Sequence, residues 1–163
     1  MSGEATITIK EWQVPTLGQR ARDPVEADDG SIWWAGQFGN LIGRLDPKTG
    51  EMVVYNMPDP AAKDPHTAVF DQAGILWFTM QQSNMIGRLD PKTGETKVVT
   101  MPTRDAKPYG IKIDADGTPW VACNGSNCLV KVDRATMALS EIKLPHEQTK
   151  VRRLDIAGDG TIW

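Results

Sequence analysis

The sequence predicts an all-β fold built from a repeated unit of four short strands. Trp, Asn, Asp and Pro residues recur without gaps every 43 or 44 residues, at Trp33, Trp77, Trp120 and Trp163, at Asn40, Asn84 and Asn127, at Asp46, Asp90 and Asp133, and at Pro15, Pro58, Pro102 and Pro145. Two copies share the string Ile-Gly-Arg-Leu-Asp-Pro-Lys-Thr-Gly-Glu, at 42–51 and 86–95. A period of about 40 to 45 residues, made of strands and turns, is typical of a β-propeller blade.

The second copy shows how the unit divides into strands. Strand-forming residues fill four short segments, 66–71, 75–79, 85–89 and 96–101. A Gln-Ala-Gly turn, a polar loop and an Asp-Pro-Lys-Thr-Gly turn separate them. In the last turn, Pro presets φ at the second position and Gly tolerates the left-handed conformation that a bulged hairpin needs. Strands this short, alternating with turns, leave no window for an amphipathic helix.

The same division fits three complete blades, at 22–58, 66–102 and 109–145. We interpret residues 1–163 as a single, incomplete propeller domain. A seven-bladed ring with this period needs about 300 residues, so the chain is expected to form about half of one. A four-bladed ring lacking one strand is the alternative that the arithmetic permits, and the usual blade numbers of propellers disfavour it.

Both ends of the chain are expected to carry parts of blades. Residues 6–14 precede Pro15 as the last strand of each copy precedes its own Pro, so they are predicted to be an outer strand separated from its blade. Residues 151–163 match the two inner strands of a fourth, partial blade. Unpaired sheet edges attract other strands, so we expect self-association through these open edges.

The last turn of the third copy departs from the pattern. Met137 stands where the first two copies have Gly50 and Gly94, and Arg134 replaces the turn proline. Met is strained in the left-handed region, so this hairpin is expected either to adopt another turn type or to tolerate strain.

Composition excludes two classes of partner. The net charge is −3 and the isoelectric point is near 5.4, with the basic residues scattered through the repeats, which argues against nucleic acid. No apolar run approaches the roughly 18 residues that span a bilayer, so no membrane association is expected. The first residues lack the features of a signal peptide, which predicts a cytoplasmic protein, or a periplasmic or secreted one if a signal peptide was removed.

The candidate functional residues lie where the predicted inner strands begin, because several blades of a propeller converge there on one concave site. The first position of these strands holds Arg22, His66, Tyr109 and Arg152, and the second holds Asp23, Thr67, Gly110 and Arg153. These residues differ from blade to blade, whereas the repeated Trp, Asn and Asp residues are interpreted as packing and turn residues. We expect a small-molecule or peptide-like ligand at this channel.

Each candidate also has a structural interpretation. His66 is a candidate general base or metal ligand, or a hydrogen-bonded residue of the channel. Tyr109 is a candidate ligand contact through its polar tip. Arg152 and Arg153 suggest an anionic or carbonyl partner, or they neutralise an acid such as Asp155. No catalytic residue and no metal ligand is assigned from these positions.

Two cysteines flank the central turn of the third copy, at Cys123 and Cys128. Facing positions across a hairpin are compatible with a disulfide, and the same spacing is compatible with two inert thiols. A bridge would indicate an oxidising compartment. Without a second pair of ligands, a zinc site is not expected.

The repeat resembles the virginiamycin B lyase, or streptogramin lyase, family of seven-bladed propellers. The family pattern Gly-x-Ile-Trp-(Trp/Phe), Asn-x-Ile-Gly-Arg-Leu-Asp-Pro-Lys-Thr-Gly-Glu and Met-Pro is matched at 31–34, 40–51 and 57–58, and again at 75–78, 84–95 and 101–102. The resemblance covers nearly all of the chain. It implies a lyase that confers antibiotic resistance. Such an enzyme linearises a cyclic depsipeptide by elimination at its ester bond, using a magnesium ion held by carboxylates and a histidine base.

The resemblance places those catalytic groups in later blades, so no catalytic residue is carried over to this sequence. Magnesium is expected in the full-length protein and no cofactor in residues 1–163. Many relatives with the same repeats have no established activity, and a fold alone does not determine function. The alternative is therefore a non-catalytic propeller that binds a ligand or a protein. Acidic residues and a His in the blades after Trp163 would favour the lyase.

Overall fold

The computed structural model describes residues 5–163, which form twelve strands in three antiparallel four-stranded sheets. The first sheet contains β1 (Ala21–Glu26), β2 (Ile32–Gly36), β3 (Leu41–Leu45) and β4 (Met52–Asn56). The second contains β5 (Pro65–Phe70), β6 (Leu76–Met80), β7 (Met85–Leu89) and β8 (Thr96–Thr100). The third contains β9 (Pro108–Ile113), β10 (Pro119–Cys123), β11 (Cys128–Val132) and β12 (Leu139–Lys143).

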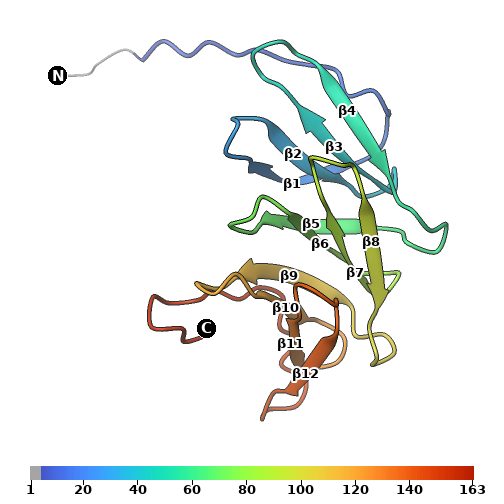
Figure 1. The fold of residues 1–163 in the computed structure, drawn as a ribbon, viewed down its shortest axis with the longest axis vertical. Helices are drawn as coiled ribbons and strands as arrows, with labels where there is room; N and C mark the ends of the chain where they lie inside the picture. The colour runs from blue at the N-terminus through green and yellow to red at the C-terminus, as the bar shows by residue number, and fades with distance from the viewer. Residues whose placement is uncertain (1–4) are drawn as a thin grey trace.

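The all-β propeller prediction is confirmed. Each sheet pairs its strands in chain order, as a propeller blade does, and the three blades follow one another from top to bottom in Figure 1. The inner strands β1, β5 and β9 begin within one residue of Arg22, His66 and Tyr109. Residues 5–163 contain no helix, and so none that could cross a membrane.

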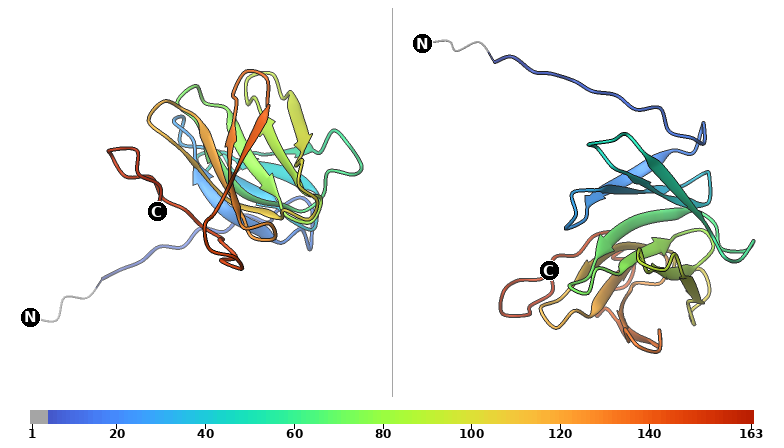
Figure 2. Two further views of the ribbon diagram at one scale, coloured as in Figure 1. Left: turned by 90° about the horizontal axis from the view of Figure 1, so that it is seen from below. Right: turned by 45° about the horizontal axis from the view of Figure 1, so that its top comes forward.

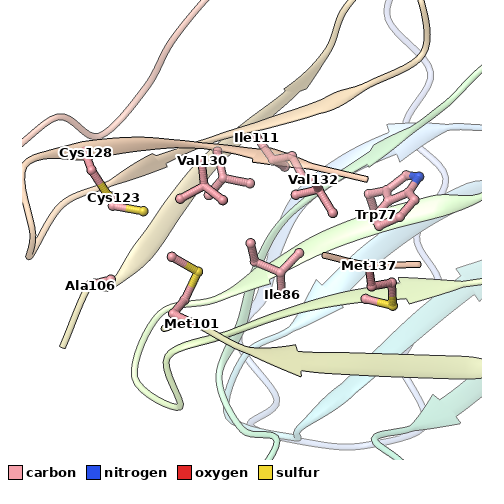
Figure 3. Packing of buried hydrophobic residues seen from close by; sticks show 11 residues of the cluster. Trp77, Ile86, Met101, Ala106, Ile111, Cys123, Cys128, Val130, Val132 and Met137 are labelled. Atoms are coloured by element: carbon pink, nitrogen blue, oxygen red, sulfur yellow. The ribbon is translucent and has the colours of Figure 1, made fainter. Parts of the chain in front are cut away.

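Of the repeated Trp residues, Trp33 and Trp77 pack between blades, as predicted, whereas Trp163 is 80% exposed. Trp33 and Trp77 are 2% and 1% exposed, and each donates its indole N–H to a side chain near its own turn, to Ser31 Oγ at 2.9 Å and to Asp71 Oδ2 at 2.9 Å. Figure 3 shows Trp77 among aliphatic residues of the second and third blades. Trp120 makes the same bond but is only half-buried, because no complete sheet covers its side of the third blade.

The two ends of the described chain form no strands of the three sheets. Residues 6–14, predicted as an outer strand, run as an exposed extended segment without strand pairing (Figure 2). A strand needs a neighbour to bond its backbone, and this segment has none within residues 5–163. In residues 151–163, where two inner strands were predicted, one bridge joins Ile156 and Ile162. The pairing of both ends therefore stays a prediction.

The departing turn of the third blade keeps its shape and tolerates strain. Met137 has a φ of 61°, close to the left-handed values of Gly50 and Gly94, and its N–H bonds to Asp133 O at 2.9 Å. The corresponding bond from each glycine is 2.8 Å long. Asp133 also caps the turn, since its Oδ1 accepts the N–H of Thr136 at 2.8 Å. The Met137 side chain is 7% exposed and packs in the core, which offsets a strain of about 1 to 3 kcal/mol.

Candidate functional site

The repeated Asn residues shape the chain just before the inner strands begin. Asn40 and Asn84 are left-handed, with φ of 52° and 59°, in the turn between the second and third strands of their blades. Their side-chain oxygens accept the backbone N–H of Asp64 and Lys107, each at 3.1 Å. These two acceptors hold the loop that leads into β5 and β9. The structural interpretation of the repeated Asn residues is thereby confirmed.

Three candidate residues from different parts of the chain meet at one carboxylate. Thr67 Oγ1 donates to Asp23 Oδ2 at 2.8 Å, and Arg153 donates to the same oxygen at 3.1 Å. Arg153 lies 130 residues after Asp23, so the site joins the first blade to the start of the partial one. The Asp23 side chain is 23% exposed and that of Arg153 is 59% exposed, so the pair faces partly toward solvent.

His66 completes this chain of hydrogen bonds. Its Nδ1 lies 3.0 Å from Thr67 Oγ1, whose single hydrogen is already donated to Asp23. Nδ1 must therefore carry the proton and donate, which leaves Nε2 as an acceptor. Nε2 has no hydrogen-bond partner in residues 5–163, and because no fully buried side-chain nitrogen there lacks one, Nε2 keeps a small exposed surface although the residue is buried.

The environment of His66 keeps its imidazole neutral. The residue is 1% exposed, and this burial, together with the guanidinium groups of Arg22 and Arg153, lowers the pKa of His66 from 6.5 to about 4. The carboxylates of Asp23 and Asp64 oppose the shift without cancelling it. A group with this pKa is a weak base at neutral pH, and its neutral ring is suited to accepting a hydrogen bond from a ligand.

Tyr109 packs against the His66 ring, and two arginines lie near the Tyr109 ring. The ring centroids of Tyr109 and His66 are 4.1 Å apart with an interplanar angle of 50°. The guanidinium carbons of Arg152 and Arg153 lie 5.7 and 5.9 Å from the Tyr109 ring centroid. The third blade approaches this segment closely, because Gly110 N bonds to Arg152 O at 2.9 Å. Arg153 neutralises Asp23 rather than the predicted Asp155, whose partner is Lys112 at 3.2 Å.

Arg22 belongs to a second polar group that the sequence analysis missed. Arg22 Nη1 donates to Gln37 Oε1 at 3.3 Å, and Gln37 Nε2 donates to Asp64 Oδ1 at 2.6 Å. Gln37 and Asp64 are both buried. Asp64 occupies the repeat position of Arg20 and Lys107, so its variation between polar residues was a signal that could have found it.

The structure thus brings all seven candidates, Arg22, Asp23, His66, Thr67, Tyr109, Arg152 and Arg153, to the starts of the inner strands. Together they make a polar surface with a neutral imidazole, a phenol and three guanidinium groups. Such a surface can donate hydrogen bonds to carbonyl oxygens and accept one from an N–H or O–H group. Their role in binding a ligand stays a prediction.

The residues described do not fit a magnesium site. Within 5–163, no group of three or more His, Cys, Asp or Glu side chains is placed to hold a metal ion. We therefore assign no chemical step to a metal held by them. The two cysteines face each other in the register of β10 and β11 as free, buried thiols, and burial beside Cys128 raises the pKa of the Cys123 thiol.

Comparison with known proteins assigns the sequence to a family. The profile of the virginiamycin B lyase family matches residues 4–163. The chain belongs to the virginiamycin B lyase family. No curated protein sequence matches it significantly.

Solved structures of lyases carry the same fold. The virginiamycin B lyase from Staphylococcus aureus superposes with a TM-score of 0.87 at 25% identity, over 96% of this chain and 52% of that one. A catalytically inactive variant of that enzyme with quinupristin gives a TM-score of 0.88 at 25% identity, over the same 96% and 52%. A streptogramin B lyase gives 0.83 at 25% identity, over 94% and 57%. The family member described here therefore spans about half the length of these lyases.

Proposed function

We propose that this chain forms one ligand-binding wall of a propeller lyase that opens the ester of a cyclic depsipeptide. The observation that carries the proposal is the family match, which runs over residues 4–163. An elimination at an ester removes a proton from carbon and breaks the C–O bond, so that an alkene and a carboxylate are formed. The group that takes the proton is not assigned to these blades, because the low pKa of His66 makes its imidazole a poor base near neutral pH.

In this proposal the polar surface at the inner strands holds the substrate. The Nε2 of His66, which has no hydrogen-bond partner in residues 5–163, accepts a hydrogen bond from an amide N–H of the ring peptide, and Asp23 and Thr67 fix the imidazole in the required tautomer. Arg152, which is exposed beside Tyr109, donates to a peptide carbonyl. Both contacts exist before and during the reaction, so they contribute to binding and not to the chemical step.

Ring opening followed by mass spectrometry tests the function. Protein that includes the blades following Trp163 is incubated with a streptogramin B antibiotic and magnesium, and the mass and fragmentation of the linear product are recorded. We expect turnover by that protein and none by residues 1–163 alone, because an elimination site needs its groups held in place by a closed scaffold. Turnover by the 163-residue chain that His66→Ala abolishes would contradict this and would make His66 the base.

A substitution distinguishes a ligand-binding role of His66 from a structural role. His66→Gln keeps a polar side chain but misplaces the acceptor, so KM is expected to rise about tenfold with little change in kcat. His146→Gln, on an exposed loop outside the site, is the matched control. A fall in kcat with KM unchanged would contradict a binding role. Tight binding of the antibiotic with no ring opening would instead support the non-catalytic binding propeller.

A further inference from the structure

A second cavity lies between the first and second blades, at the ends of the strands opposite to the candidate site. The turn between β1 and β2 and the turns of the second blade enclose about 470 Å³. This volume is in the range of small-molecule pockets. Both blades that form its walls are complete, so the cavity does not depend on residues outside the described chain.

Three aromatic residues form the apolar floor of this cavity. Trp33 and Tyr55 are stacked, with centroids 5.3 Å apart and planes 18° apart. Phe70 of the second blade meets Trp33 edge-on at 5.8 Å and 87°. Trp33 is buried, whereas Tyr55 and Phe70 are half-buried and keep ring surface open to the cavity. A flat apolar group can pack against these two rings.

The charged residues that line the cavity differ in whether they already have a partner. The Asp71 carboxylate accepts the indole N–H of Trp77 at 2.9 Å and two backbone N–H groups. Arg44 and Asp29 form an ion pair at 3.1 Å, and Asp29 also accepts from Ser31, so these charges are already partnered. Asp28, in the turn of the first blade, and Lys92, in the last turn of the second, also line the cavity. Across residues 5–163, the side chains of Asp28 and Lys92 form no ion pair or hydrogen bond. The carboxylate of Asp28 and the ammonium group of Lys92 are therefore available to a ligand, and they come from different blades.

The aromatic floor is not a general property of the repeat. At the corresponding positions between the second and third blades, Val99 replaces Tyr55 and Ile113 replaces Phe70. Both aliphatic residues pack against the core around Trp77. Tyr55 and Phe70 pack in the same way against the core around Trp33, and the aromatic pair is specific to the first two blades.

The charges also differ between the two clefts. Ala135 occupies the position of Lys92 in the third blade. Arg88 donates to Arg134 O at 3.0 Å and closes over that cleft. The Arg134 guanidinium lies against Gly117, where a Cβ would collide with it. The cleft between the second and third blades is therefore occupied by side chains of the protein itself.

We propose that the cavity between the first two blades binds a free aromatic amino acid. The ring packs against Tyr55 and Phe70, the α-ammonium group pairs with Asp28, and the α-carboxylate pairs with Lys92. Charge complementarity selects a zwitterion, because a ligand with one charge leaves the opposite rim charge unpartnered. This proposal is independent of the lyase proposal, since the cavity lies at the other end of the strands and its test uses no antibiotic.

Calorimetric titration of the 163-residue chain tests the proposal. L-phenylalanine is the probe, and N-acetyl-L-phenylalanine amide keeps the ring while removing both charges. We expect L-phenylalanine to bind with a millimolar Kd and the uncharged derivative to bind at least about tenfold more weakly, since it loses two charged contacts. Equal binding of the two compounds, or no binding of L-phenylalanine, would overturn the proposal.

The repeat supplies a matched pair of variants for the cation. Lys92 and Lys48 hold the same position in identical Asp-Pro-Lys-Thr-Gly turns, and only Lys92 lines the cavity. Both are exposed, so neither Lys92→Gln nor Lys48→Gln is expected to disturb folding. Lys92→Gln should weaken the binding of L-phenylalanine at least about threefold, and Lys48→Gln should leave this binding unchanged. Equal effects of both variants would show that the titration reports general charge and would overturn the assignment of Lys92.

Discussion

Thr67 donates a 2.8 Å hydrogen bond to Asp23, and this contact joins the second blade to the first at the channel side of the fold. The inner strands β1 and β5 belong to separate sheets and share no backbone ladder. The two blades are therefore joined by side chains, namely the hydrophobic core between them and the polar contacts at the starts of β1 and β5. The same bond orients His66, because Thr67 can accept from Nδ1 only while its own hydrogen points to Asp23.

Thr67→Val is expected to destabilise the chain by about 1 to 3 kcal/mol, because it removes a donor to a partly buried carboxylate while keeping the side-chain shape. Urea unfolding measures the loss. Thr67→Ser retains the hydroxyl and should lose less than half as much. A Val variant as stable as the parent would mean that Arg153 alone satisfies Asp23.

The buried, neutral His66 predicts a pH dependence of stability. Folding lowers the pKa of His66 from 6.5 to about 4, so the unfolded chain binds more protons between these two values. The free energy of unfolding should therefore rise with pH through this window. The contribution is complete above 6.5 and is lost as the pH falls toward 4, by about 3 kcal/mol in total.

Urea unfolding across that window, for the parent chain and for His66→Gln, checks this dependence. The variant should show a flatter pH profile, and His146→Gln should leave the profile unchanged. Parallel profiles for the parent and His66→Gln would indicate that other groups cause the dependence.

The blades were predictable because each is encoded by local signals that recur. The Asp-Pro-Lys-Thr-Gly turns require an acceptor, a fixed φ and a left-handed residue in that order, and Asp46 and Asp90 each accept the N–H two residues later at 2.8 Å. Met137 shows that the surrounding strands can impose the same turn on an unfavourable residue. The sequence alone could not decide between another turn type and a strained turn, because the residues that pack against Met137 and offset its strain are distant in the chain.

The sequence predicted which residues form the candidate site better than it predicted which of them contact each other. Variation between repeats identified His66 and Tyr109, and the repeat register placed Asp23 and Arg153 at equivalent positions, but it did not show that these two residues, 130 apart, form an ion pair. Asp155 stands closer in the chain and was one partner considered for the arginines, yet Lys112 neutralises it. Contacts between blades depend on how the sheets are angled, and a repeat pattern carries no information about that angle.

Trp77 and Trp120 offer a comparison of burial at equivalent positions. Both donate to an Asp six residues earlier, Trp77 to Asp71 at 2.9 Å and Trp120 to Asp114 at 2.8 Å. Trp77 is 1% exposed and Trp120 half-buried. Trp77→Ala is expected to cost about 3 to 5 kcal/mol and Trp120→Ala clearly less, measured by chemical denaturation. Equal losses would place Trp120 in a core that these 163 residues do not show, such as an interface between copies.

The close contact of Gly110 with the backbone of Arg152 and Arg153 indicates how the third blade holds this segment. A Cβ on Gly110 would lie 2.5 Å from Arg152 O and 3.1 Å from Arg153 Cα, which are backbone atoms that cannot rotate away. Gly110→Ala should therefore push this segment off β9, break the bond from Gly110 N to Arg152 O and draw Arg153 away from Asp23.

The expected result is a loss of about 1 to 3 kcal/mol in the free energy of unfolding and faster hydrogen exchange at the amide of residue 110. Gly158→Ala is the matched control, since a Cβ there meets nothing within 4 Å and the residue belongs to the same terminal segment. Because Thr67 still bonds Asp23, the first two blades should keep their exchange protection in Gly110→Ala. An unchanged exchange rate at residue 110 would mean that the segment is not held by β9 in solution, and the ion pair of Arg153 with Asp23 would then have to arise in another way.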